Sequence, residues 1–224
     1  MRLAIFDVDG TLVDSGAMIA ASLTSAFKAE GLPVPERDRL MSIVGLSLLD
    51  AMKALAPEQE HAEHERLAAA YKEAFWENRA KGQHMEHLFE GALDLLVRLR
   101  AREDVVLGIA TGKTRRGVDH LFERLGFEDW FTTVQTSDDH PSKPHPSMIV
   151  TALAETGLDA SAAIMIGDTS YDIAMARAAG VGAAGVSWGN HATDELTRAG
   201  AHTISNDFKE LEQHLEAIWQ DRMK

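Results

Sequence analysis

The sequence Leu3-Ala4-Ile5-Phe6-Asp7-Val8-Asp9-Gly10-Thr11 decides how the rest of the chain is interpreted. Its first four residues are all apolar, and an unbroken apolar run is typical of a strand buried on both faces of a parallel sheet. Two aspartates follow at once, and Gly10 permits a sharp turn at the end of the strand. In open α/β sheets, ligands bind beyond the carboxyl ends of the strands. The stretch therefore predicts a buried strand that delivers two acids to a ligand-binding edge.

Further apolar runs predict the other strands of the same sheet. They are Val105–Ala110, Thr133–Thr136, Ala163–Ile166 and Gly182–Val186, with a weaker strand at His202–Ile204. Helical patterns separate them, at Thr114–Leu125, Pro146–Thr156 and Tyr171–Ala179, and a last helix runs from Asp207 to about residue 221. Alternating strands and helices predict an α/β fold, a doubly wound parallel sheet with helices on both faces.

The segment between the first two strands breaks this alternation. It contains only helical patterns, at Ala17–Glu30, Arg39–Leu55 and Gln59–Ala80. Roughly seventy residues are far more than a crossover connection needs, since that takes about a dozen. We therefore predict an all-helical domain, residues 15–85, inserted into an α/β core made of residues 1–14 and 86–224. Its two hinges would lie at Asp14-Ser15 and in the stretch before Gly91.

Composition narrows the classes of function. The 224 residues include 22 Lys and Arg against 35 Asp and Glu, a formal charge of −13, so an acidic surface disfavours a general nucleic-acid binder. There is no cysteine, which excludes disulfides, thiolate metal sites and thiol nucleophiles. The apolar run at the N-terminus is too short for a signal peptide, and no run approaches the ~18 to 20 apolar residues of a membrane span. We expect a cytoplasmic protein with no membrane partner.

Polar residues gather where the predicted strands end. Thr111-Gly112-Lys113 follows the second strand, Ser142-Lys143-Pro144 follows the third, and Gly167-Asp168, with Asp172 nearby, follows the fourth. Acids, a hydroxyl group and a lysine around one point suit a hard divalent cation bound together with a phosphate. The simpler interpretation of Asp7 and Asp9 is a turn in which they bond to local backbone amides. A structural role is also the favoured interpretation of the loop at 188–191.

The order of these motifs resembles a known family. DVDGTLVDS, TGK, SKP and GDTSYD resemble the four motifs of the haloacid dehalogenase superfamily, and most of all its phosphoglycolate-phosphatase-like branch, which carries a helical cap after the first motif. The resemblance implies that Asp7 is the nucleophile and that Asp9 acts first as general acid and then as general base. It implies that Thr111, Gly112 and Lys143 hold the transferring phosphoryl group. It also implies Mg²⁺ as cofactor, bound by Asp7, Asp168 and the Asp9 backbone carbonyl, with Asp172 supporting the metal shell.

The family resemblance implies a phosphatase that hydrolyses a small phosphorylated metabolite, with phosphoglycolate as one candidate. We expect the protein to be a monomer or a homodimer. The main alternative is a phosphomutase on the same scaffold, although mutase-like relatives usually carry Glu-Asp in the fourth motif, where this chain has Gly167-Asp168. A phospho-signalling receiver uses similar residues, but the long helical insertion argues against it. Sustained turnover would separate an enzyme from a receiver.

Overall fold

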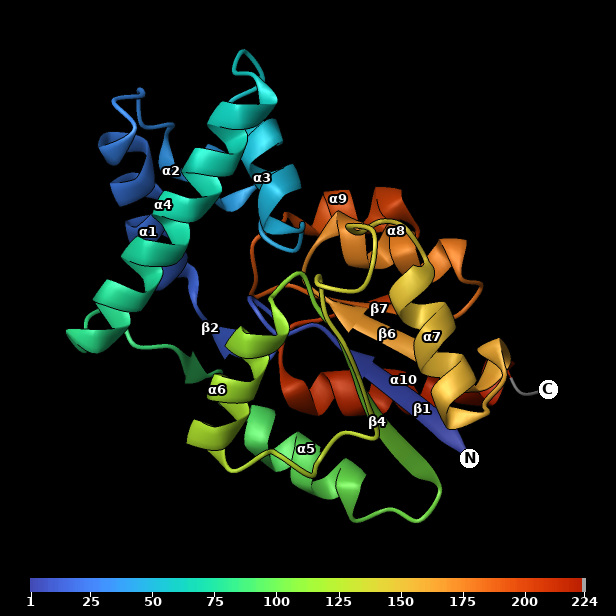
Figure 1. Ribbon diagram of the computed structural model, residues 1–224. Coiled ribbons are helices and arrows are strands. Elements are labelled where there is room, and N and C mark those ends of the chain that lie inside the picture. Colours follow the sequence, from blue (N-terminus) through green and yellow to red (C-terminus); the bar gives the residue numbers. More distant parts are fainter. Residues whose placement is uncertain (223–224) are drawn as a thin grey trace.

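A six-stranded parallel sheet forms the centre of the molecule, with the strand order β5-β4-β1-β6-β7-β8 (Figure 1). The computed structural model describes residues 1–222. The strands are β1 (Arg2–Phe6), β4 (Val105–Ala110), β5 (Thr133–Gln135), β6 (Ala163–Gly167), β7 (Gly182–Val186) and β8 (Thr203–Ser205). The fold expected from the sequence is confirmed, and the first strand lies inside the sheet, between β4 and β6.

Both faces of β1 are buried, which explains its unbroken apolar sequence. Leu3 and Ile5 pack into one hydrophobic core, and Ala4 and Phe6 pack into the core on the opposite face. Side chains alternate between the two faces of a strand. Because helices cover both faces, the side chains on both are buried and therefore apolar.

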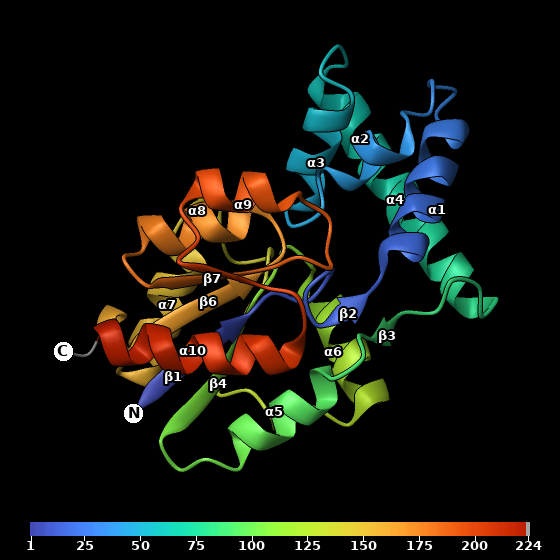
Figure 2. The same cartoon turned by 180° about the vertical axis from the view of Figure 1, so that it is seen from behind.

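Helices cover the two faces of the sheet in separate layers (Figure 2). The first layer contains α5 (Ala92–Arg100), α6 (Arg115–Leu125) and α10 (Phe208–Arg222). The second layer contains α7 (Ser147–Thr156), α8 (Ser170–Ala178) and α9 (Thr193–Ala199), and the short 3₁₀ turn Ala160–Ala162 precedes β6. No helix within residues 1–222 is long and apolar enough to cross a membrane.

The remaining helices form a bundle that lies apart from the sheet and has its own hydrophobic core (Figures 1 and 2). They are α1 (Gly16–Ala29), α2 (Arg37–Met41), α3 (Leu48–Leu55) and α4 (His61–Ala80). The expected single helix over Arg39–Leu55 is wrong, because a turn separates α2 from α3. Gly45 has a φ of +99° in this turn, a conformation that glycine adopts without strain.

The chain passes twice between the bundle and the sheet, and the two passages pair. β2 (Val13–Asp14) and β3 (His87–Leu88) form a short antiparallel ribbon at the positions predicted as hinges. We call residues 15–85 the cap; its exact boundaries stay a prediction.

Candidate active site

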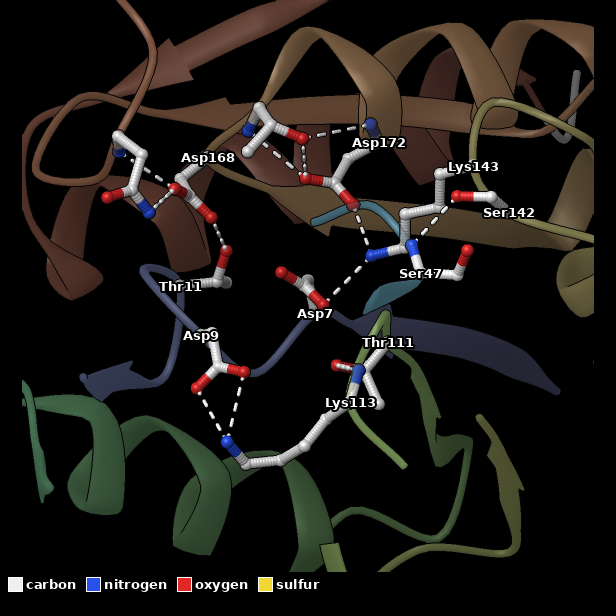
Figure 3. A network of polar contacts seen from close by, with 12 residues as sticks. Asp7, Asp9, Thr11, Ser47, Thr111, Lys113, Ser142, Lys143, Asp168 and Asp172 are labelled. Carbon is white, nitrogen blue, oxygen red and sulfur yellow. Dashed lines mark hydrogen bonds and ion pairs between the residues drawn. The ribbon is translucent and has the colours of Figure 1, made fainter. Parts of the chain in front are cut away.

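The carboxyl ends of neighbouring strands bring the predicted site residues to one edge of the sheet. Asp7 follows β1, Thr111 follows β4 and Asp168 follows β6, while Lys143 comes from the loop after β5. Because β4, β1 and β6 are adjacent and parallel, these ends meet at one place. Figure 3 shows the side chains of Asp7, Lys143, Asp168 and Asp172 around a common centre.

Three acids form the centre of this site. One carboxylate oxygen from each of Asp7, Asp168 and Asp172 lies within 4.8 Å of the others, and all three side chains are buried. Lys143 is buried with them, and its Nζ donates to Asp7 Oδ1 at 2.8 Å and to Asp172 Oδ1 at 2.6 Å. A single ammonium group faces three carboxyl groups, so the centre has an excess of negative charge.

The excess charge is reflected in the acidity of two of the carboxyl groups. Burial raises the pKa of Asp7 to about 8; Lys143 lowers it, whereas the Asp172 and Asp168 carboxylates raise it further. Burial, followed by the charge of Asp172, raises the pKa of Asp168 to about 6. Burial alone would lower the pKa of Lys143, but the two carboxylates it contacts outweigh this and hold it above its ordinary value. A further cation would stabilise the ionised acids.

Hydrogen bonds fix Asp168 and Asp172 and leave part of Asp7 free. The Thr11 hydroxyl donates to Asp168 Oδ1 at 2.8 Å, and the backbone and side-chain amides of Asn190 both donate to Asp168 Oδ2 at 2.8 Å. Thr169 donates to Asp172 through its amide and its hydroxyl group. Asp7 Oδ2 is buried and has no hydrogen-bond partner within residues 1–222. Such a free oxygen beside other carboxylates suits a divalent cation that prefers oxygen ligands.

Gly10 is needed at this edge for two reasons. Its φ is +89°, which turns the chain at the end of the strand. A Cβ atom at this position would also lie 2.3 Å from Asp168 Oδ2 and from Asn190 Nδ2. The glycine therefore lets the first motif approach the fourth closely enough for Thr11 to reach Asp168.

The second aspartate of the first motif belongs to a different set of contacts. Asp9 points away from the three acids, toward Lys113 (Figure 3). Lys113 Nζ donates to both Asp9 oxygens, at 3.0 and 3.1 Å, and to Glu86 Oε1 at 3.0 Å. Arg79 of α4 bonds to the other Glu86 oxygen at 3.3 Å. Asp9 is thereby linked to the second hinge and to the cap.

The Lys113 ion pairs are expected to contribute substantially to stability. Lys113→Met should lower the free energy of unfolding by about 3 kcal/mol, because it leaves the mostly buried Asp9 and Glu86 carboxylates facing each other. Urea denaturation measures this loss. The double variant Lys113→Met/Asp9→Asn should recover part of it, since it removes the charge of Asp9, whereas Glu86 keeps its ion pair with Arg79. Equal losses in the single and double variants would show that these charges are not coupled.

The cap contacts this edge of the sheet through the turn between α2 and α3. The backbone N–H of Ser47 donates to the Ser142 hydroxyl at 2.8 Å, and the Tyr171 hydroxyl donates to the Ser42 carbonyl at 3.1 Å. At Gly112, a Cβ atom would lie 2.6 Å from the carbonyl oxygens of Gly45 and Leu46. A side chain at Gly112 would push the cap away. The second motif therefore packs directly against the backbone of the cap.

A cavity of about 350 Å³ lies between the cap and the core. Asp7, Asp9, Thr111, Gly112 and Lys113 line it on the core side, and apolar residues of the cap line the opposite side. The buried hydroxyl of Thr111 accepts from the Lys113 backbone N–H at 3.2 Å. Thr111 and Gly112, two of the residues assigned to phosphate from the sequence, thus face a space that a small molecule can occupy. Lys143, the third, does not line this space but contacts Asp7, which does.

Sequence reasoning missed several residues that hold the site together. Thr11, Thr169 and Asn190 orient the acids, and Lys113 belongs to the second motif but was assigned no role. The loop at 188–191 was interpreted as structural, yet Asn190 contacts Asp168 directly. Its position after β7, the strand next to β6, is the signal that could have identified it.

The sheet, the cap and the four strand-end motifs define a class of protein, and comparison identifies it. The family model for haloacid dehalogenase-like hydrolases matches residues 4–186. The chain belongs to this family, and the expected enzyme class, a phosphoric monoester hydrolase, is confirmed.

Individual relatives span almost the whole chain. A probable phosphatase, IndB, of Dickeya dadantii is 34% identical over 93% of this chain and 91% of its own. A phosphoglycolate phosphatase of Photorhabdus laumondii is 27% identical over 94% of this chain and 91% of its own. Among solved structures, a hydrolase from Pseudomonas syringae superposes with a TM-score of 0.85 at 28% identity, covering 97% of this chain and 99% of the other.

Proposed function

We propose that this chain is a Mg²⁺-dependent phosphatase that hydrolyses a small phosphomonoester through a phospho-aspartate on Asp7. The observation that carries the proposal is the arrangement of the Asp7 carboxylate. One oxygen is held by Lys143, and the other is buried without a hydrogen-bond partner among the described residues, in a side chain that lines the cavity. A carboxylate held in place beside a ligand-sized space is positioned to act as a covalent nucleophile, and its unpartnered oxygen leaves room for a metal ligand bond.

The first step transfers the phosphoryl group to the protein. A carboxylate oxygen of Asp7 attacks phosphorus, the ester P–O bond breaks, and Asp9 donates a proton to the departing oxygen. Thr111, the Gly112 backbone amide and Lys143 would hold the non-bridging phosphoryl oxygens, whose charge must be stabilised during transfer.

In the second step a water molecule attacks the phosphorus of phospho-Asp7, and Asp9 removes its proton. The P–O bond to Asp7 breaks, which releases inorganic phosphate and regenerates the carboxylate. Asp9 suits both steps because it also lines the cavity and is separate from the three buried acids. The Lys113 contacts would orient its carboxylate between the steps.

The residues present fit a magnesium ion. Asp7, Asp168 and the Asp9 backbone carbonyl would hold it, and Asp172 would support the site through Lys143. When bound, Mg²⁺ neutralises negative charge on the acids and on the phosphate. The excess of carboxylates over ammonium groups at this centre is the reason that the site needs such a charge.

The raised pKa values predict how magnesium and pH affect stability. The ordinary pKa of an aspartate is 3.8, but in the folded protein the pKa of Asp7 is about 8 and that of Asp168 is about 6. Between about pH 4 and pH 8 the folded protein therefore binds more protons than the unfolded chain. The stability of the protein in chelator should therefore fall as the pH rises from about 4 to about 8. Excess Mg²⁺ should raise the melting temperature by roughly 5–10 °C near pH 8, and by less near pH 5.5.

Thermal unfolding with and without Mg²⁺ at both pH values measures this effect. Asp168→Asn provides the control, because it should remain folded and lose most of the stabilisation by Mg²⁺. A stabilisation that is independent of pH, or unchanged in Asp168→Asn, would place the metal elsewhere.

A panel of small phosphate esters tests the function directly. Phosphoglycolate belongs in the panel because a relative is named for it, and sugar phosphates test the mutase alternative. We expect release of inorganic phosphate over many turnovers in Mg²⁺ and none in excess chelator. Full turnover in chelator would contradict the proposal, and a single stoichiometric phosphorylation would indicate a receiver.

A further inference from the structure

The wall that the cap contributes to the cavity is almost entirely apolar. Ile19 and Leu23 from α1, Ile43 and Val44 from the α2–α3 turn, Met52 from α3 and Phe75 from α4 all line it and are buried. Tyr71 and Trp76 extend this surface, with ring centroids 6.0 and 5.8 Å from that of Phe75. A leaving group attached to a phosphate at Asp7 would point toward this wall, since the core residues form the other side.

Lys113 lines the cavity and Lys143 lies beside it against Asp7, and both cations are already neutralised. Lys143 is bonded to Asp7 and Asp172, and Lys113 to Asp9 and Glu86. The other two cations that line the cavity, Lys72 and Arg116, are exposed, which places them where it opens to solvent. The Arg116 guanidinium also lies over the Trp76 ring, 4.6 Å from its centroid. A carboxylate placed against the cap wall would therefore find no free buried cation within the described residues.

Resting on the proposed function, we infer that the substrate is a phosphomonoester whose leaving group is apolar and uncharged. An aliphatic or aromatic group would bury its surface against the wall, which is favourable. A carboxylate such as that of phosphoglycolate would lose water without gaining a free buried cation there. The several hydroxyl groups of a sugar would meet few polar side-chain groups on the cap wall, chiefly the Tyr71 hydroxyl, which is costly. The chemistry of the wall thus selects against the polar substrates that the family resemblance suggested.

A homologous series of alkyl phosphates tests the inference while keeping the chemistry of the leaving group nearly constant. From ethyl to pentyl phosphate, kcat/KM should rise by up to about fourfold for each added methylene. Pentyl phosphate should exceed 5-(phosphonooxy)pentanoate, which carries a carboxylate in place of the terminal methyl, by at least about tenfold. A flat series, or a preference for the carboxylated ester, would overturn the inference.

Two neighbouring leucines provide matched variants. Leu48 lines the cavity, whereas Leu49 is similarly half-buried but lies outside the cavity lining. Leu48→Arg places a cation beside the apolar wall and should raise the ratio of carboxylated to plain ester by at least about tenfold, whereas Leu49→Arg should leave the ratio unchanged. An equal shift in both variants would contradict a role for the cavity.

Binding of non-hydrolysable analogues separates this inference from the proposed activity. Calorimetry should show tighter binding of pentylphosphonate than of 5-phosphonopentanoate, also by at least about tenfold. If no ester is hydrolysed but this difference in binding is found, the apolar site stands and the phosphatase proposal fails. If many esters are hydrolysed but the carboxylated analogue binds more tightly, the phosphatase proposal stands and the apolar site fails.

Discussion

Asp7→Asn is expected to lower kcat by on the order of 10⁴-fold or more with every phosphate ester, and to abolish covalent labelling by a ³²P-phosphorylated substrate. The amide has nearly the shape of the carboxylate, and its carbonyl oxygen can still accept the hydrogen bond from Lys143. It cannot attack phosphorus, so only the much slower direct reaction with water would remain. Rapid acid quenching followed by protein precipitation measures the label.

The same variant should remain folded, which distinguishes lost chemistry from lost structure. The ionised Asp7 carboxylate is unfavourable in the metal-free protein, as its raised pKa shows. Asp7→Asn should therefore be more stable than the unmodified protein in chelator near pH 8. Asp14→Asn, in β2 and away from the cavity, serves as the control that keeps full activity. Turnover of Asp7→Asn within about tenfold of the unmodified enzyme would remove Asp7 from the nucleophile role.

The core of the fold could be predicted because its signals are local. A strand such as β1 is buried on both faces, so its sequence is apolar without interruption, and helical patterns between such strands indicate a parallel sheet. The sequence also predicted that the residues after Phe6 and Ala110 lie at the carboxyl edge of the sheet, and the structure places them there. Those inferences required only neighbouring residues.

Features that depend on distant contacts could not be predicted. The ribbon of β2 and β3 has strands of two residues each, too short for any periodicity to appear. The α2–α3 turn interrupts an apolar pattern that continues on both sides, and its docking against Ser142 and Tyr171 involves residues far along the chain. Only the tertiary structure shows why the helix ends there.

The same distinction between local signals and distant contacts applies to the candidate site. Motif spacing identified Asp7, Asp9, Thr111, Lys143, Asp168 and Asp172 as candidates. It could not show which side chains would pair, because Asp7 and Asp9 are neighbours in sequence yet contact different lysines. Glu86, which shares Lys113 with Asp9, lies at the second hinge and belongs to no motif.

Because Asp7 and Asp9 contact different lysines, their carboxylates lie in different electrostatic environments. Asp7 lies in the buried acidic centre, whereas Asp9 lies beside Lys113 on the wall of the cavity. A nucleophile must stay fixed, but a general acid and base must reach first the leaving oxygen and then a water molecule. Because Asp9 is bonded through Lys113 and Glu86 to Arg79 of the cap, a movement of the cap would change its surroundings.

Asp9→Asn is expected to separate the two chemical steps. An alkyl phosphate releases a poor leaving group that needs a proton, so the first step should slow by about 10² to 10⁴. An aryl phosphate releases a stable phenolate and needs that proton much less. The second step lacks its base with either substrate, so the aryl ester should give a burst of phenolate and accumulate phosphorylated protein.

Rapid-quench measurement of phenolate and of covalent phosphate in the same samples tests this expectation, with Asp7→Asn as the control that shows neither. The amide in Asp9→Asn can still accept a hydrogen bond from Lys113, so the fold and the cavity should be preserved. The burst amplitude should approach one phenolate per active site, because the first step is complete before the second begins. Continued slow turnover of Asp9→Asn without any covalent phosphate would favour direct attack by water, and Asp7 would then be a metal ligand only.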